Sequence, residues 1–164
     1  MQAAKKVIEA VGREFGDSFG RYHGGMIEEY RCEDAEVVMV TTGSVTGTAR
    51  IVVDHMRAKG IKVGLVKLRF FRPFPSEYFK ELKARVKAVG IIDRNLSFGY
   101  EGAVGSEVKA AMYDAGKCPG VIDFIAGIAG RDIRKEDIEL MYNKLLNLSK
   151  GMAEEELQFI GLRW

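Results

Sequence analysis

Short apolar runs alternate with amphipathic segments along most of this chain. The apolar runs predict buried strands at residues 36–41, 61–68, 88–93 and 120–126. Each run is followed by hydrophobic residues at helical spacing, which predicts helices at residues 46–59, 76–86, 103–115 and 135–148. Four strand–helix alternations indicate an α/β fold with parallel strands and helices on both faces of the sheet.

The two ends of the chain have different patterns. Residues 3–15 carry apolar side chains on one helical face, and glycines follow in a loop that ends by residue 25. Residues 26–31 predict a short edge strand. The tail 149–164 is rich in apolar groups, which favours docking onto this domain or onto a partner. The expected division is therefore 1–25 packing on the domain, 26–148 as the α/β domain, and 149–164 as the tail.

Length and charge narrow the possible functions. The 164 residues, 47% of them hydrophobic, suit one domain with its own core. The 25 basic and 23 acidic residues are interspersed, so no nucleic-acid or membrane-surface patch is predicted. The start has no signal-peptide pattern and no run is long enough to span a membrane, which predicts a cytoplasmic protein. Cys32 and Cys118 lie too far apart to suggest zinc or iron–sulfur ligation, and free thiols are expected.

The first strand ends in a turn of small residues that opens the next helix. Backbone N–H groups and hydroxyls at such a helix start could bind a phosphate or carboxylate. The alternative is a tight turn in which Ser44 or Thr46 caps the helix, and the absence of a P-loop lysine favours it. The candidate residues are Thr42, Gly43, Ser44, Thr46, Gly47 and Thr48.

A second polar loop follows the strand at residues 88–93. Its acid, guanidinium and amide groups could reach an anion or an adjoining subunit, or could form a network that holds the loop's own backbone. These candidates are Asp93, Arg94, Asn95, Ser97 and Glu101.

Other residues are candidates for subunit contacts. Phe98 and Tyr100 are aromatic residues of the kind that anchor interfaces, and Trp164 ends the apolar tail. Arg131 could form an interface pair with Asp132, although a helix-capping role for Asp132 is the simpler interpretation. His23 and His55 have no acid or nucleophile at a fixed offset, so no catalytic residue and no metal ligand are predicted.

Three segments occur in an order and spacing that resemble a known family. They are AEVVMVTTGSVTGTARIVVDHMRAKGIKVGLVKLRFFRPFP, VGIIDRNLSFGYEGAVGSEVKAAMY and VIDFIAGIAGRDI. Through residues 26–148 the chain resembles the carboxy-terminal, transketolase-C-like domain of the α subunit of pyruvate:ferredoxin oxidoreductase, also called pyruvate synthase. The helix and FGRYHGG loop before it resemble the segment entering that domain.

The resemblance implies a three-layer α/β/α fold with a five-stranded mixed sheet of order 1-3-2-4-5. Its first strand, residues 26–31, would be antiparallel. Strands 36–41 and 88–93 would lie side by side while their helices leave toward opposite faces, which is a topological switch point. Residues 41–48 and 93–105 would then flank one crevice.

The resemblance also implies a function in a larger complex. Such enzymes use thiamine diphosphate, magnesium and iron–sulfur clusters to oxidise a 2-oxoacid, with coenzyme A and ferredoxin as partners. This chain lacks the Gly-Asp-Gly stretch followed by Asn and the cysteine set for clusters, so it is expected to bind none of these cofactors alone. We expect a structural or assembly domain, inactive in isolation, whose partners are thiamine-binding β, γ and ferredoxin-like δ subunits. The alternative is a stand-alone anion- or nucleotide-binding module.

Overall fold

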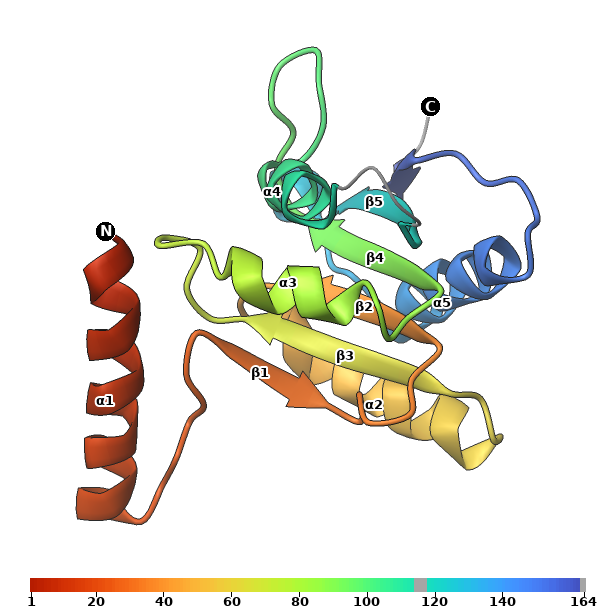
Figure 1. Ribbon diagram of the computed structural model, residues 1–164. Coiled ribbons are helices and arrows are strands. Elements are labelled where there is room, and N and C mark those ends of the chain that lie inside the picture. The colour runs from red at the N-terminus through yellow and green to blue at the C-terminus, as the bar shows by residue number, and fades with distance from the viewer. Residues whose placement is uncertain (114–117, 163–164) are drawn as a thin grey trace.

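The computed structural model describes residues 1–113 and 118–162. Helices and strands alternate through most of these residues (Figure 1). In chain order the elements are α1 (Gln2–Phe19), β1 (Ile27–Tyr30), β2 (Val37–Thr41), α2 (Val45–Ala58), β3 (Val63–Leu68), α3 (Ser76–Leu82), β4 (Ala88–Asp93), α4 (Ala103–Met112), β5 (Gly120–Ala126), the 3-10 turn η1 (Ile128–Gly130), α5 (Lys135–Ser149) and β6 (Leu157–Ile160).

The strands form a single mixed sheet of order β1-β3-β2-β4-β5-β6. Strand β1 runs antiparallel to β3, and the other neighbouring pairs are parallel. The order of the first five strands and the antiparallel edge are as the resemblance implies. All five residues of β2 are buried, because a central parallel strand is covered on both faces.

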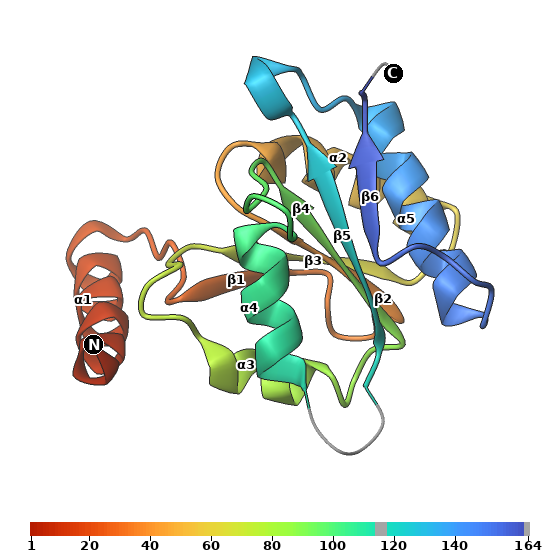
Figure 2. The ribbon, with the colours of Figure 1, turned by 90° about the horizontal axis from the view of Figure 1, so that it is seen from above.

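The sheet has six strands, so the prediction of a five-stranded sheet was wrong. The additional strand β6 lies in the segment expected to be a tail, and it pairs in parallel with β5 (Figure 2). The carbonyl of Glu156 accepts a hydrogen bond from the Asp123 N–H at 2.8 Å as this pairing begins. A strand of four residues is too short to show an alternating pattern in the sequence, and its pairing partner is distant along the chain.

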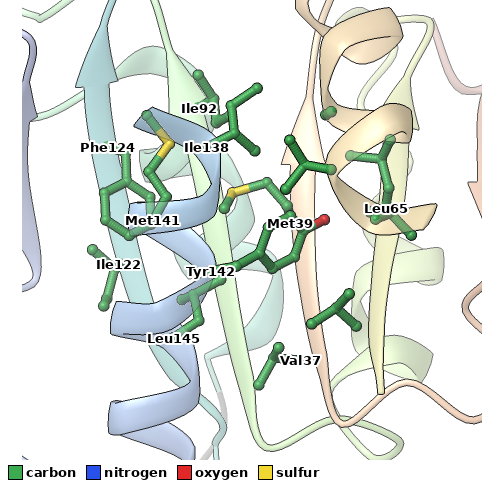
Figure 3. Packing of buried hydrophobic residues seen from close by; sticks show 14 of the residues in the cluster. Val37, Met39, Leu65, Ile92, Ile122, Phe124, Ile138, Met141, Tyr142 and Leu145 are labelled. Carbon is green, nitrogen blue, oxygen red and sulfur yellow. The ribbon is translucent and has the colours of Figure 1, made fainter. Parts of the chain in front are cut away.

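Two helices cover each face of the sheet. Helices α2 and α5 pack together on one face, and α3 and α4 pack together on the other. Each face of the sheet has its own hydrophobic core. Figure 3 shows the core on the face covered by α2 and α5, where side chains of α5 such as Met141 and Leu145 lie against β2, β4 and β5. The hydroxyl of the fully buried Tyr142 donates to the Gly64 carbonyl of β3 at 2.9 Å, so α5 also bonds to the far side of this layer.

Several predicted helix ends differ from the structure. Helix α1 continues past Gly16 and ends where Gly20 adopts the left-handed conformation. Helices α3 and α4 are shorter than predicted and end at Leu82 and Met112. Asp132 does not cap α5. The N-cap residue is Arg134, and the Arg134 N–H donates a hydrogen bond to Asp137 Oδ2 at 2.9 Å.

Helix α1 lies beyond the β1 edge of the sheet, at the margin of the molecule (Figure 1). None of its residues is buried, and Lys5 forms an ion pair with Glu77 of α3 at 2.7 Å. Among the described residues, no helix combines the length and apolar character that a membrane span requires.

Candidate functional site

The two candidate loops meet at the carboxyl ends of adjacent parallel strands. Strands β2 and β4 are neighbours, while α2 and α4 lie on opposite faces of the sheet. This is the topological switch point that the resemblance implies, and it is where ligands usually bind in open α/β sheets. A cavity of about 210 Å³ lies there. Its lining consists of Ser44, Val45, Thr48, Arg94, Arg131, Asp132 and Ile133.

In the turn before α2, some polar side chains form hydrogen bonds within the turn and others line the cavity. Thr46 is buried, and its hydroxyl bonds the Gly43 carbonyl at 2.9 Å and the Thr41 hydroxyl at 3.0 Å. Ser44 holds the N-cap position, but its side chain makes no capping bond. Ser44 and Thr48 line the cavity, whereas Thr42, Gly43, Thr46 and Gly47 do not. Neither Ser44 nor Thr46 therefore caps α2 through its side chain.

Two arginines from distant loops reach the same cavity. Arg94 follows β4, and its Nη2 lies 3.4 Å from the Gly127 carbonyl. Arg131 follows β5 and η1, and its Nη1 donates to the Gly161 carbonyl at 2.6 Å. The sequence indicated Arg94 as a ligand candidate and Arg131 as an interface candidate, and the structure places both in one cavity. The segment 131–133 forms a wall of the crevice that was not predicted.

The start of α4 is held by side chains from beneath the helix. Its N-cap is Gly102, which has no side chain, so the exposed N–H groups of the first turn need other acceptors. Asp93 Oδ2 accepts from Val104 N–H at 2.9 Å and from Gly105 N–H at 2.8 Å. Asp123 Oδ2 accepts from Gly102 N–H at 2.7 Å. The two carboxyl groups thus replace the missing capping side chain.

The remaining candidates of this loop also bond within the protein. Asn95 Oδ1 accepts from the Ala103 N–H at 3.2 Å, and Ser97 N–H donates to the Glu101 carbonyl at 3.0 Å. The buried Glu101 carboxylate accepts from Lys109 Nζ at 2.5 Å. Asp93, Asn95, Ser97 and Glu101 therefore take part in a network that holds the loop's own backbone, and only Arg94 of this loop lines the cavity.

Burial raises the pKa values of the two aspartates under α4, Asp93 and Asp123. Burial raises the pKa of Asp123 to about 7, the Gly102 N–H bond opposes the shift, and the nearby charges of Asp93 and Glu101 add to it. Burial also raises the pKa of Asp93, despite its bonds from Gly105 and Val104. The second oxygen of Asp123, Oδ1, is buried without a hydrogen-bond partner. Asp123 is therefore mostly protonated below neutral pH and ionises as the pH rises through about 7.

Sequence reasoning overlooked Asp123 and Lys109. Asp123 stands in the apolar strand GVIDFIA, and a single acid in a strand that is otherwise apolar was the available signal. Lys109 lies two helical turns after Glu101, and nothing in the sequence showed that their charges meet. Burial by itself lowers the pKa of Lys109, but the bond to Glu101 raises it on balance.

Exposed aromatic residues lie near the tip of the loop between β4 and α4. This loop projects away from the sheet in Figure 1. Phe98 is fully exposed and Tyr100 is 66% exposed, so most of the surface of both rings is open to solvent. Trp164, the other aromatic interface candidate, lies outside the described residues.

A second surface feature is an apolar groove along α1. It has a volume of about 490 Å³ and lies between α1 and residues of the following loop and of the segment after β3. Val7, Val11 and Phe15 line it, and all three are exposed to solvent. The apolar face of α1 is therefore open in the structure.

The described residues show neither a metal-binding cluster nor a paired nucleophile and base. In residues 1–113 and 118–162, no group of three or more His, Cys, Asp and Glu side chains is arranged to hold a metal ion. Both cysteines are free, with Cys32 buried and Cys118 exposed. The acids under α4 bond to backbone N–H groups and to Lys109 rather than to a nucleophile.

A mixed sheet with an antiparallel first strand, covered on both faces and with its crevice at the switch point, defines a domain of the transketolase C-terminal type. Residues 35–138 match the family model described as pyruvate:ferredoxin oxidoreductase core domain II. The chain belongs to this family, and the resemblance seen in its sequence is confirmed.

Curated relatives match nearly the whole chain. The ketoisovalerate oxidoreductase subunit VorA of Pyrococcus horikoshii is 40% identical over 99% of this chain. The pyruvate synthase subunit PorA of Methanosarcina barkeri is 41% identical over 99% of it. The chain spans 41% of the length of each of these relatives.

Solved structures share the fold. A 2-oxoglutarate:ferredoxin oxidoreductase from Magnetococcus marinus, solved with 2-oxoglutarate, coenzyme A and succinyl-CoA bound, aligns with a TM-score of 0.56 at 19% identity. That match covers 82% of this chain and 21% of the other. A split-gene transketolase, described as an inactive β4 tetramer, aligns with a TM-score of 0.56 at 20% identity, covering 71% of this chain and 40% of the other.

Proposed function

We propose that this chain acts as a structural and assembly domain of a 2-oxoacid:ferredoxin oxidoreductase and is not catalytic by itself. The observation that carries the proposal is the sequence identity of about 40% to PorA and VorA subunits along 99% of the chain. Identity at this level over a whole domain supports a shared role in the complex. The alternative of a stand-alone binding module has no support from these relatives.

The complex would supply the chemistry that this chain lacks. We propose that thiamine diphosphate, magnesium and iron–sulfur clusters are bound by other parts of the enzyme, and that coenzyme A and ferredoxin are its reaction partners. The other subunits would be of the thiamine-binding β, γ and ferredoxin-like δ types, and the complex would be cytoplasmic. The chain is as similar to a ketoisovalerate enzyme subunit as to a pyruvate enzyme subunit, so the proposal names the class of 2-oxoacids rather than one substrate.

The projecting loop is the proposed contact with another subunit. Phe98 and Tyr100 expose large aromatic surfaces there, while Asp93 and Asn95 hold the base of the loop to α4. Exposed aromatics on a supported loop are suited to anchoring an interface. The division into an N-terminal segment, a central domain and a C-terminal segment is likewise proposed to serve assembly.

The experiment is co-purification of the tagged chain with its native partners, followed by an assay for 2-oxoacid-dependent ferredoxin reduction. We expect the chain alone to be inactive and to recover thiamine-binding subunits. Phe98→Ser with Tyr100→Ser should reduce recovery, whereas Tyr113→Ser, an exposed tyrosine at the other end of α4, should not. Ferredoxin reduction by the chain alone would refute the proposed non-catalytic role.

A further inference from the structure

The cavity at the switch point brings together two arginines and two hydroxyl groups. Arg94 and Arg131 come from loops after different strands, and Ser44 and Thr48 come from the start of α2. The loops after parallel strands meet at this edge of the sheet, so the cavity depends on the fold rather than on any local motif. Its volume of about 210 Å³ is large enough for a small polyatomic ion.

Both guanidinium groups are anchored and retain unused donors. Arg94 Nη2 lies 3.4 Å from the Gly127 carbonyl, and Arg131 Nη1 donates to the Gly161 carbonyl at 2.6 Å. A guanidinium group has five N–H donors, so each arginine has several left for a ligand. Anchoring by a carbonyl fixes the position of the positive charge without neutralising it.

Arg94 and Arg131 form no ion pair in the described part of the chain, a property they share with Arg13, Arg21 and Arg69, which do not line this cavity. In residues 1–113 and 118–162, no carboxylate lies within ion-pairing distance of Arg94 or Arg131, although Asp132 is next in sequence and lines the same cavity. Six arginines elsewhere in the described chain each pair with an acid: Arg31, Arg50, Arg57, Arg72, Arg85 and Arg134. The cavity lining therefore holds two guanidinium groups that form no ion pair and a single carboxylate, that of Asp132, which leaves a net positive charge.

The start of α2 adds to the positive potential. Ser44 occupies the N-cap position of this 14-residue helix, and its hydroxyl makes no capping bond. The N-terminal end of a helix carries a partial positive charge. The hydroxyl of Ser44 is thus available as a donor, on the side of the cavity where a helix already favours an anion.

We propose that this cavity binds a phosphoryl oxyanion, either free orthophosphate or the terminal group of a phosphate monoester, through Arg94, Arg131 and Ser44. Arginine is suited to this ligand because its planar group can bond two phosphate oxygens at once. Asp132 weakens the binding because its negative charge faces the same space. The site is independent of the proposed role in assembly, since it requires only this chain.

The direct test is isothermal titration calorimetry of the chain with orthophosphate, with AMP and with adenosine at constant ionic strength. Binding of orthophosphate and AMP, but not of adenosine, is the expected result. AMP binding more tightly than orthophosphate would identify a monoester as the better ligand, and the reverse would identify the free ion. No heat from either phosphate compound at millimolar concentration would overturn the proposal.

Substitutions locate the site. Arg94→Gln and Arg131→Gln should each weaken phosphate binding by about tenfold, the usual loss when one charge-assisted contact is removed. Arg21→Gln, an exposed arginine away from the cavity, should not change it. Asp132→Asn should tighten binding, a result that loss of structure cannot produce.

A further variant distinguishes loss of the binding site from misfolding, which could also explain lost binding in the arginine variants. Ser44→Glu keeps both arginines and places a carboxylate at the start of α2, where a negative charge is compatible with the helix. It should abolish phosphate binding while the thermal melting temperature stays at or above the wild-type value. Phosphate binding that survives Ser44→Glu and both arginine substitutions would overturn the proposed site.

Discussion

The Gly102 N–H donates to Asp123 Oδ2 at 2.7 Å, which joins the start of α4 to the middle of β5. Asp123 is fully buried, and its other oxygen has no partner. The bond explains why the long loop after β4 returns to the same place on the sheet. It also makes the stability of this corner depend on the protonation of one carboxyl group.

Asp123→Asn should change the pH dependence of stability. The pKa of Asp123 is raised from 3.8 to about 7 in the folded protein, so between these pH values the folded state holds a proton that the unfolded chain releases. Stability contributed by this group therefore falls as the pH rises through that window. Asparagine does not titrate, so urea unfolding should show the stability of the variant rising relative to that of the wild type between about pH 4 and pH 7.

Other charged groups near Asp123 also contribute to the pH dependence of stability. Asp93 keeps its own raised pKa, and Glu101, Lys109 and Glu156 also surround the site, so the pH slope should shrink rather than vanish. Asp17→Asn, at an exposed position in α1, should retain the wild-type slope. An identical slope in Asp123→Asn and wild type would contradict the predicted proton uptake.

Gly105→Ala should destabilise the protein. A Cβ atom at this position would lie 2.6 Å from Asp123 Oδ2 and 2.7 Å from its Cγ, so α4 would have to move away from β5. Overpacking of this kind costs about 1–3 kcal/mol in the free energy of unfolding, which urea denaturation measures. Gly47→Ala is the matched control, because it lies in α2 with no atom within 4 Å of the added Cβ. It should be neutral or stabilising by about 0.5–1 kcal/mol.

Tyr142→Phe should weaken the attachment of α5 to β3. The substitution removes the hydroxyl that donates to the Gly64 carbonyl at 2.9 Å, within a fully buried site. We expect a loss of about 1–2 kcal/mol in the free energy of unfolding, as for other buried hydrogen bonds. Tyr113→Phe, at an exposed tyrosine, should leave the value unchanged, and equal effects of the two substitutions would argue against this bond.

The two thiols should differ in reactivity. Cys32 is buried beside the Leu65 carbonyl, and burial raises the pKa of its thiol to about 11, whereas Cys118 is exposed. Only the thiolate reacts readily, so DTNB at pH 8 should modify one thiol per folded chain and both in denaturant. Cys118→Ser should abolish the fast reaction. Two fast thiols in the folded wild-type chain would contradict the burial of Cys32.

Much of the fold was predictable from the sequence because the signals were local. Strand β4 occupies residues 88–93 as predicted, and α5 was predicted to within a residue, since a continuous apolar run and a helical spacing are properties of neighbouring residues. Strand β6 was missed because only its pairing with β5 distinguishes four residues from an apolar tail. Helix α1 is longer than the predicted 3–15, because Gly16 lies inside the helix and Gly20 ends it.

The candidate site was predictable only as two loops at one edge of the sheet. The sequence by itself determined the alternation of strands and helices, the family resemblance, and the positions of Ser44 and Arg94 at the ends of neighbouring strands. Only the tertiary structure decided that Arg131 joins them, and that Asp93 and Asp123 serve the start of α4 instead. The physical reason is that side-chain charge partners and hydrogen bonds are set by contacts between segments far apart in the chain.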